Sequence, residues 1–213
     1  MRTMLLVFTA LLIFAVFFSG CSTVPTPSPV EPPVIVNPSP TPNPTVYKFK
    51  WDNPSWTATM LDQIKLSGMD KLKPKDMEEF GLTEGMDALK FWGNIVVEIA
   101  KWESNFKPDA TYKEPFRDGR GNRVISSGLF QISIESANNR NRGDCKFREQ
   151  SELFNPHLNI RCSVKIMTFF IKESNLIRGV NPNRGLARYW SVVRGNSSTH
   201  TRNALKAIRA ANN

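Results

Sequence analysis

Residues 83–106, with the sequence TEGMDALKFWGNIVVEIAKWESNF, form the stretch that decides the fold. At 100° per residue its apolar side chains gather within one arc, which predicts an amphipathic helix from near Thr83 to about Asn105. The residues of this arc are Leu89, Trp92, Val96 and Ile99. Thr83 can cap the first turn, and Glu84 suits the positive end of the helix dipole. This is the strongest helix signal in the chain.

Glu103 falls inside the apolar arc of this helix, whereas Glu98 lies on the opposite face and is expected to be a solvated surface acid. A carboxylate on the core side loses water, and this loss raises its pKa. Glycoside cleavage needs such an acid, because the leaving oxygen must be protonated near neutral pH. Buried-face glutamates also occur in structural ion pairs, and on spacing alone that case is the commoner one.

Three further signals complete a mostly helical domain with one small hairpin. A second helix is expected to begin at the Asn-Pro pair 155–156, a favoured cap followed by a favoured first residue. A last helix is expected over 199–211. The Asp-Gly pair 118–119 is a turn dipeptide that predicts a β-hairpin over 116–124. Residues 46–82, with breaks at their two prolines, are expected to form an N-terminal cap on the main body.

Four short blocks follow one another in the chain: 103–106 (ESNF), 126–132 (SSGLFQI), 155–160 (NPHLNI) and, in part, 186–190 (LARYW). Together they resemble the soluble lytic transglycosylases and their goose-type lysozyme relatives. The patterns of that family are Glu-Ser-x-Phe, Ser/Ala-x-Gly-Leu-Met-Gln-Ile, Asn-Pro-x-x-Asn-Ile and Ala-Tyr-Asn. The resemblance covers roughly residues 86–195, and the blocks stand in the family's order.

The resemblance implies a lysozyme-like α+β domain over 83–213, with a groove for alternating N-acetylmuramic acid and N-acetylglucosamine. It assigns Glu103 as the general acid and then the general base, while the C6 hydroxyl of muramic acid attacks the anomeric carbon and gives a 1,6-anhydro product. It also implies that Ser127 and Gln131 contact sugar and that Tyr189 forms a hydrogen bond near the glutamate. Alternatively, Ser127 and Gln131 satisfy a turn and Tyr189 is a core aromatic. No cofactor or metal is implied.

Two departures from the family pattern leave alternatives open. Trp190 replaces an asparagine, so a polar sugar contact is missing, and the indole is expected either to stack on a sugar or to pack in the core. Asp118 stands on the predicted hairpin, where goose-type lysozymes place acidic residues that assist water. A second carboxylate there would make the enzyme a hydrolase, although an aspartate at a hairpin tip is more often a turn residue. We favour transglycosylation over hydrolysis, and both over a non-catalytic peptidoglycan-binding lipoprotein.

The first 20 residues have the layout of a bacterial secretory signal. Arg2 supplies a positive charge, an apolar run covers 5–18, and a small Ser-Gly pair stands before Cys21. This junction resembles a lipobox, at which a peptidase cuts before a cysteine that becomes lipidated. An ordinary signal peptide or an uncleaved anchor is the alternative. In a Gram-negative envelope, Ser22 in place of an aspartate after the cysteine predicts an outer-membrane lipoprotein that faces the periplasm.

Residues 21–45 are expected to carry the lipid and to form a linker. Nine prolines and almost no charge occur in 22–45, a composition that predicts an extended polyproline II spacer rather than a core. The remaining chain is long enough for one domain.

Cys145 and Cys162 remain as a pair if Cys21 takes lipid, and an oxidising compartment makes a disulfide the default. A metal site that also uses His157 competes with this interpretation, but the spacing is weak evidence for zinc. Without its leader, which holds one of the 28 basic residues and none of the 19 acidic ones, the chain has a net charge of +8. Such a charge suits anionic lipid or an acidic wall polymer. We expect peptidoglycan strands and a membrane as partners, no nucleic acid, and a monomer.

Overall fold

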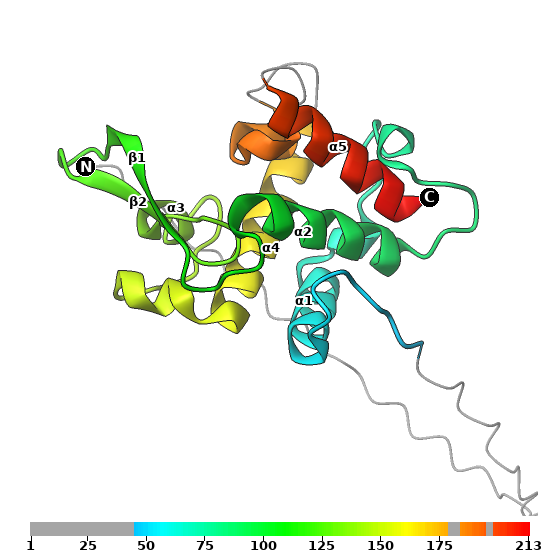
Figure 1. Cartoon of the computed structure of the whole chain (residues 1–213), viewed down its shortest axis with the longest axis horizontal. Coiled ribbons are helices and arrows are strands. Elements are labelled where there is room, and N and C mark those ends of the chain that lie inside the picture. Colours follow the sequence, from blue (N-terminus) through cyan, green and yellow to red (C-terminus); the bar gives the residue numbers. More distant parts are fainter. Residues whose placement is uncertain (1–44, 179–183, 195–197) are drawn as a thin grey trace, which may run out of the picture. The chain divides into compact units, whose positions relative to one another are not determined.

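The computed structural model describes residues 45–178, 184–194 and 198–213 (Figure 1). Its α-helices are α1 (Pro54–Ser67), α2 (Ala88–Ser104), α3 (Ile134–Ala137), α4 (Pro156–Ser174) and α5 (Thr199–Asn212). One sheet of two strands, β1 (Thr111–Arg117) and β2 (Arg123–Ser127), lies between α2 and α3 in the chain. Short 3₁₀ turns connect these elements: Met69–Lys71, Glu78–Phe80, Gln150–Phe154, Gly185–Arg188 and Ser191–Val193. The predicted leader, Cys21 and the proline-rich linker lie outside the described residues.

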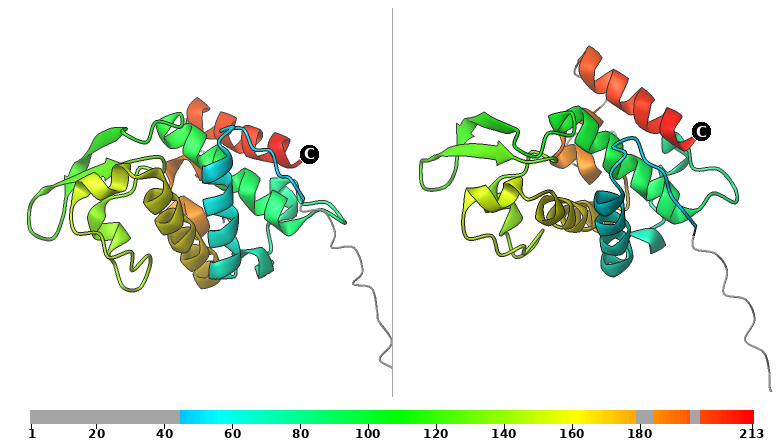
Figure 2. Two further views of the ribbon diagram at one scale, coloured as in Figure 1. Left: turned by 90° about the horizontal axis from the view of Figure 1, so that it is seen from below. Right: turned by 60° about the horizontal axis from the view of Figure 1, so that its bottom comes forward.

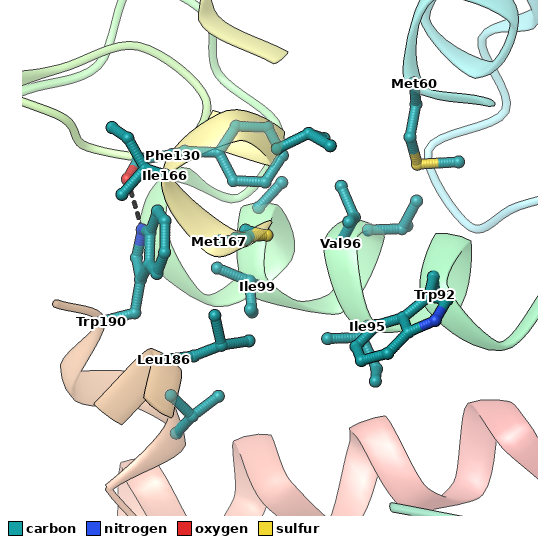
Figure 3. Close-up of a cluster of buried hydrophobic side chains, with 14 of the residues drawn as sticks. Met60, Trp92, Ile95, Val96, Ile99, Phe130, Ile166, Met167, Leu186 and Trp190 are labelled. Carbon is teal, nitrogen blue, oxygen red and sulfur yellow. Dashed lines mark hydrogen bonds between the residues drawn. The ribbon is translucent and has the colours of Figure 1, made fainter. Parts of the chain in front are cut away.

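Helix α2 is the centre of the fold. Residues 91–100 are buried without exception, because α5 packs along one side of the helix while α1 and the 3₁₀ turns cover others (Figure 2). Around it, Phe130, Met167 and Leu186 bring three other segments into one apolar cluster (Figure 3). A helix that is buried on every side has no solvated face. The sequence-based expectation that Glu98 is a surface acid is therefore wrong.

Glu98 is accommodated in the core by an ion pair. Its Oε1 lies 2.8 Å from Nζ of Lys50, which belongs to the segment that precedes α1. The same segment contacts the start of α2, where the Tyr47 hydroxyl donates a 3.0 Å hydrogen bond to Asp87. The N-terminal segment is therefore tied to the central helix both where the helix begins and near its middle.

The central helix begins at Ala88 rather than near Thr83. The Asp87 side chain accepts a hydrogen bond from the amide of Lys90 and caps the helix. Residues before it form turns, with Gly85 in the left-handed region at φ 77°. Pro54 also differs from its expected role as a break. It occupies the first turn of α1, whose cap is Asn53, because a helix start tolerates a proline.

The strands β1 and β2 form an antiparallel hairpin that projects from one end of the helical body (Figure 1). Tyr112 pairs with Ser126 and Arg117 with Arg123, but the register shifts between Lys113 and Arg117. This bulge gives β1 extra residues relative to its partner. The hairpin and the predominance of helix confirm the predicted fold class, a mainly α, lysozyme-like α+β domain.

The later helices begin where the sequence indicates. Asn155 accepts hydrogen bonds from the amides of His157 and Leu158, so the Asn-Pro pair does open α4. Cys145 and Cys162 form a disulfide with a Cα–Cα distance of 5.7 Å, which joins the loop before α4 to that helix. His157 hydrogen-bonds to Thr59 instead of joining the cysteines. Within the described residues, no helix is long and apolar enough to cross a membrane, and no three potential metal ligands cluster.

Candidate active site

An open groove of about 1350 Å³ runs between the C-terminal end of α2, the hairpin and the 188–194 segment. Helix α2 supplies residues 101–104 and its C-cap Asn105, and both strands supply side chains from the opposite wall. Gln131 and Ser133, which follow β2, also line it. The groove is thus lined by residues from three of the four sequence blocks, 103–106, 126–132 and 186–190.

Glu103 lies in the last turn of α2, where the helix wall meets the groove. The residue is partly exposed, but its Oε1 is buried and has no hydrogen-bond partner among the described residues. Burial raises the pKa of its carboxyl from 4.5 to about 8, helped by the nearby charge of Glu114 and opposed by Arg194. The group therefore keeps its proton at neutral pH and can donate it to a leaving oxygen.

Glu114 is the second carboxylate of the groove. It lies on β1 within the bulge and is half-buried, and its Oε1 accepts a 2.5 Å hydrogen bond from the Ser126 hydroxyl on β2. Bulges commonly redirect a side chain beside an active site, and the adjacent Pro115 has no N–H to pair with β2. Sequence reasoning did not single out Glu114. The available signal was its strand position opposite the 126–132 block.

Asp118 is placed at the tip of the hairpin, at the outer rim of the groove. Its Oδ1 accepts hydrogen bonds from the amides of Arg120 at 2.9 Å and Asn122 at 2.8 Å. Backbone hydrogen bonding, first of all from Asn122, lowers the pKa of this carboxyl. These contacts are those of a turn residue, and the carboxylate whose charge helps to raise the pKa of Glu103 is Glu114.

Ser127 and Gln131 have different surroundings. Ser127 is completely buried, and its hydroxyl accepts a 2.7 Å hydrogen bond from Gln150, so the groove-lining serine of this block is Ser126. Gln131 does line the groove, while its Nε2 donates to the carbonyls of Ala110 and Gly128. The side-chain amide of Gln131 therefore stabilises the turn, and the same residue also lines the groove.

Gly128 shows why this loop needs a glycine. Its φ is 79°, and a Cβ there would lie 2.3 Å from the side chain of Asn159 and from the carbonyl of Leu153. The buried Asn159 on α4 donates to the carbonyls of Ser127 and Leu153 and accepts from the amide of Phe130. The hydrogen bonds of Asn159 thus connect the 126–132 block, which lines the groove, to the 155–160 block.

Tyr189 and Trp190 lie side by side at the inner wall. Burial raises the pKa of the Tyr189 hydroxyl, and hydrogen bonding with Ser136 and Ser133 opposes this rise. The charges of Glu103 and Glu114 add to the rise, so this hydroxyl lies within electrostatic reach of both carboxylates. It accepts a 3.3 Å hydrogen bond from the amide of Ser133. Trp190 is 1% exposed, and its Nε1 donates to the carbonyl of Phe130 (Figure 3). Its indole packs in the core, the second of the two roles expected for it.

Further groove residues were not apparent from the sequence. Arg194 donates from Nε to the carbonyl of Ala187, which holds its charge near enough to Glu103 to oppose the rise of the Glu103 pKa. Trp102 precedes the catalytic candidate, and its ring meets that of His200 edge-on at 4.8 Å. His200 comes from the far end of the chain, so only the folded structure reveals this pair.

A proton-holding glutamate near a second carboxylate, in an open groove of a lysozyme-like domain, is typical of proteins that act on glycosidic bonds. Comparison with known families agrees, because the transglycosylase SLT domain matches residues 83–204. The chain belongs to this family, whose members act on the glycan strands of peptidoglycan.

Among solved structures, the chain is similar to wild-type Bd0314 DslA, with 30% identity and a TM-score of 0.65 over 73% of this chain and 88% of that one. Two mutants of that protein match over the same shares, at 29% and 30% identity with TM-scores of 0.65 and 0.64. In each, one glutamate is replaced by glutamine, and the two positions are eleven residues apart. No protein among those with curated descriptions matches the chain.

Proposed function

We propose that the protein cleaves the β-1,4 bond between N-acetylmuramic acid and N-acetylglucosamine in peptidoglycan, as a lytic transglycosylase with Glu103 as its general acid. The observation that carries this proposal is the buried carboxyl of Glu103 at the wall of the groove. Its pKa of about 8 leaves a proton available at neutral pH, in a groove open enough for a polymer. Membership of the transglycosylase SLT domain family supports the same reaction.

In this reaction, Glu103 gives its proton to the glycosidic oxygen as the bond to the anomeric carbon breaks. Positive charge then develops on the sugar, next to the carboxylate that Glu103 has become. The C6 hydroxyl of the same muramic acid attacks the anomeric carbon, and Glu103 takes back a proton from that hydroxyl. The products are a 1,6-anhydromuramic end and a free N-acetylglucosamine end, and no water is consumed.

Hydrolysis is the second candidate, and Glu114 is the observation that favours it. A second carboxylate in the groove would accept a proton from water and so replace the C6 hydroxyl as nucleophile. Glu103 and Glu114 are eleven residues apart, as are the two glutamates that were replaced in Bd0314 DslA. In this candidate Glu114, rather than the tip residue Asp118, takes the role of the second acid.

Mass spectrometry of sacculi digested by the purified domain separates these reactions. Transglycosylation predicts anhydromuropeptides as the main products, whereas hydrolysis predicts reducing muramic ends. Turbidity recorded in the same digestion tests a third alternative. A peptidoglycan-binding protein without activity would sediment with sacculi and leave both turbidity and muropeptide profile unchanged, and that result would contradict the proposal.

We also propose that the protein acts as a monomeric outer-membrane lipoprotein in the periplasm, with Cys21 as the lipidated residue. The Ser-Gly-Cys junction and the proline-rich linker support this location, because the linker would let a tethered domain reach a polymer some distance from the membrane. Fractionation tests it: wild type is expected in the outer membrane and Cys21→Ala in a soluble fraction. Retention of Cys21→Ala in the membrane would count against lipid anchoring.

A further inference from the structure

Two arginine side chains lie against one buried aromatic ring at the edge of the groove. The guanidinium carbons of Arg142 and Arg188 are each 5.5 Å from the ring centre of Phe170, on α4. Phe170 is 1% exposed and cannot move aside, and both arginines line the groove that contains Glu103. Cation–π contacts at this distance hold both positive charges beside the Phe170 ring.

These two charges are only partly compensated. Arg188 forms a two-pronged ion pair with Glu173, with distances of 3.0 and 2.8 Å from its Nη1 to the two carboxylate oxygens. Arg142 has no hydrogen bond or ion pair from its guanidinium among the described residues. Glu135 also lines the groove, but it forms an ion pair with neither arginine. Both arginines line the same part of the groove wall, so an anion bound there would be attracted by the positive charge that remains uncompensated.

The position of Arg142 is fixed by its loop. The disulfide between Cys145 and Cys162 fastens this loop to α4, and Asn138 exchanges two hydrogen bonds with the backbone of Phe147 across it. At Gly143 a Cβ would lie 2.7 Å from the carbonyl of Ala137, so the backbone beside Arg142 is closely packed. The backbone at Arg142 is therefore held in place by these contacts, which fixes the position from which its side chain extends.

Further positive charge lies next to Arg142, around a second hollow that Glu103 does not line. This hollow of about 350 Å³ is bordered by Arg142, Lys165 and Lys172. Its one carboxylate among the described lining residues, Asp144, is already paired with Lys146 at 2.6 Å. Arg188, Arg142, Lys165 and Lys172 thus form a basic track that leaves the groove along α4.

We propose that this basic track binds the free carboxylates of the peptide stem on muramic acid. The inference rests on the proposed function, which puts a glycan strand in the groove. N-acetylglucosamine is uncharged, whereas the stem branches off the strand at muramic acid and carries carboxylates. A branch that leaves the groove past Phe170 would meet Arg188 and Arg142 first and the lysines next. The track would then make the enzyme prefer strands whose stems are present and anionic.

The test uses soluble glycan oligomers with stems, once with free stem carboxylates and once with these carboxylates amidated. Binding is measured by calorimetry in a Glu103→Gln background, so that no cleavage occurs and the result does not depend on which reaction the enzyme catalyses. The parent should bind the free-carboxylate oligomer more tightly, and added salt should reduce the preference. Arg142→Gln and Arg188→Gln should each reduce this preference about two- to fivefold, the range expected for loss of a partly exposed charge pair.

Arg140→Gln is the matched control, because Arg140 is exposed on the same loop and lines neither hollow. It should leave the preference unchanged. Equal affinity of the parent for the two oligomers would overturn the proposal, and so would losses at Arg142 and Arg188 that are the same for both. If the oligomers bind with the expected preference but the wild type leaves them uncut, the proposed function fails and the basic track stands.

Discussion

The hydroxyl of Ser126 donates a 2.5 Å hydrogen bond to Oε1 of Glu114, across the two strands of the hairpin. This contact holds a second carboxylate in the groove, where its charge helps to raise the pKa of Glu103. The hairpin therefore has an electrostatic effect on the central helix as well as forming one wall of the groove. If Glu114 only raises the pKa of Glu103, the reaction is transglycosylation. If Glu114 also accepts a proton from water, the reaction is hydrolysis.

Glu114→Gln separates these possibilities. In a transglycosylase, the variant should still form anhydromuropeptides, and its activity should decline at a lower pH than in wild type, because a charge that raises the Glu103 pKa has been removed. Rates measured against pH, together with product masses, check this. A loss of activity of about 10² or more, with reducing ends as the wild-type product, would instead establish hydrolysis. Asp118→Asn serves as the control and should be nearly silent.

The raised pKa of Glu103 has a consequence for stability. Between pH 4.5 and about 8 the folded protein binds a proton here that the unfolded chain releases, so deprotonation costs stability as pH rises through this range. Glu103→Gln removes the cost. Above pH 8 it should be more stable than wild type by about 1–3 kcal/mol, allowing for the partial exposure of the residue, and near pH 4.5 the difference should vanish. Urea unfolding of wild type and Glu103→Gln at several pH values measures this. A difference in the free energy of unfolding that does not change with pH would contradict the prediction.

Lys50 should matter for stability far from the groove. Lys50→Met leaves the Glu98 carboxylate buried without its ion partner, and we expect a loss of about 2–4 kcal/mol in the free energy of unfolding. Adding Glu98→Gln should recover most of this loss, because the neutral amide is less costly to bury. Lys48→Met, at an exposed neighbouring position, is the control. Equal stability of Lys50→Met and Lys48→Met in chemical denaturation would disprove a structural role for the pair.

The disulfide should account for a substantial part of the stability. Replacing Cys145 and Cys162 by serine removes a cross-link between positions 17 apart, for which the chain-entropy model gives about 3 kcal/mol. Denaturation of wild type with and without reductant should show the same difference, and the double variant should be insensitive to reductant. Two freely alkylated thiols in the native protein would contradict the cross-link.

Local rules were enough to predict much of the fold. The Asn155 cap, the proline after it and the Asp-Gly turn each act within a few residues, and each predicted element is present. The burial of Glu98 was beyond such rules, because its partner Lys50 is 48 positions away and the helix face that appears polar in sequence is covered by that segment. Periodicity shows which residues share a face, but not which faces are covered.

The site was predictable to a similar extent. Glu103 was predicted from its helix position and from the sequence block around it, and it does line the groove. Ser127 was expected in the groove in place of Ser126, and in a strand a shift of one residue exchanges the two faces. Glu114 was missed because the hairpin was predicted only over 116–124 and the bulge that redirects Glu114 has no clear sequence signal. Asp118 was singled out because goose-type lysozymes place acidic residues on this hairpin. Strand register and bulges are set by tertiary packing.

The most direct test of Glu103 as the general acid is a digestion of purified sacculi by Glu103→Gln, followed by muropeptide mass spectrometry. Glu84→Gln, at an exposed position before α2, is the matched control. We expect Glu103→Gln to fold and to bind sacculi like wild type while releasing products about 10²- to 10⁴-fold more slowly, and Glu84→Gln to be as active as wild type. Release of muropeptides by Glu103→Gln at the wild-type rate would contradict the assignment.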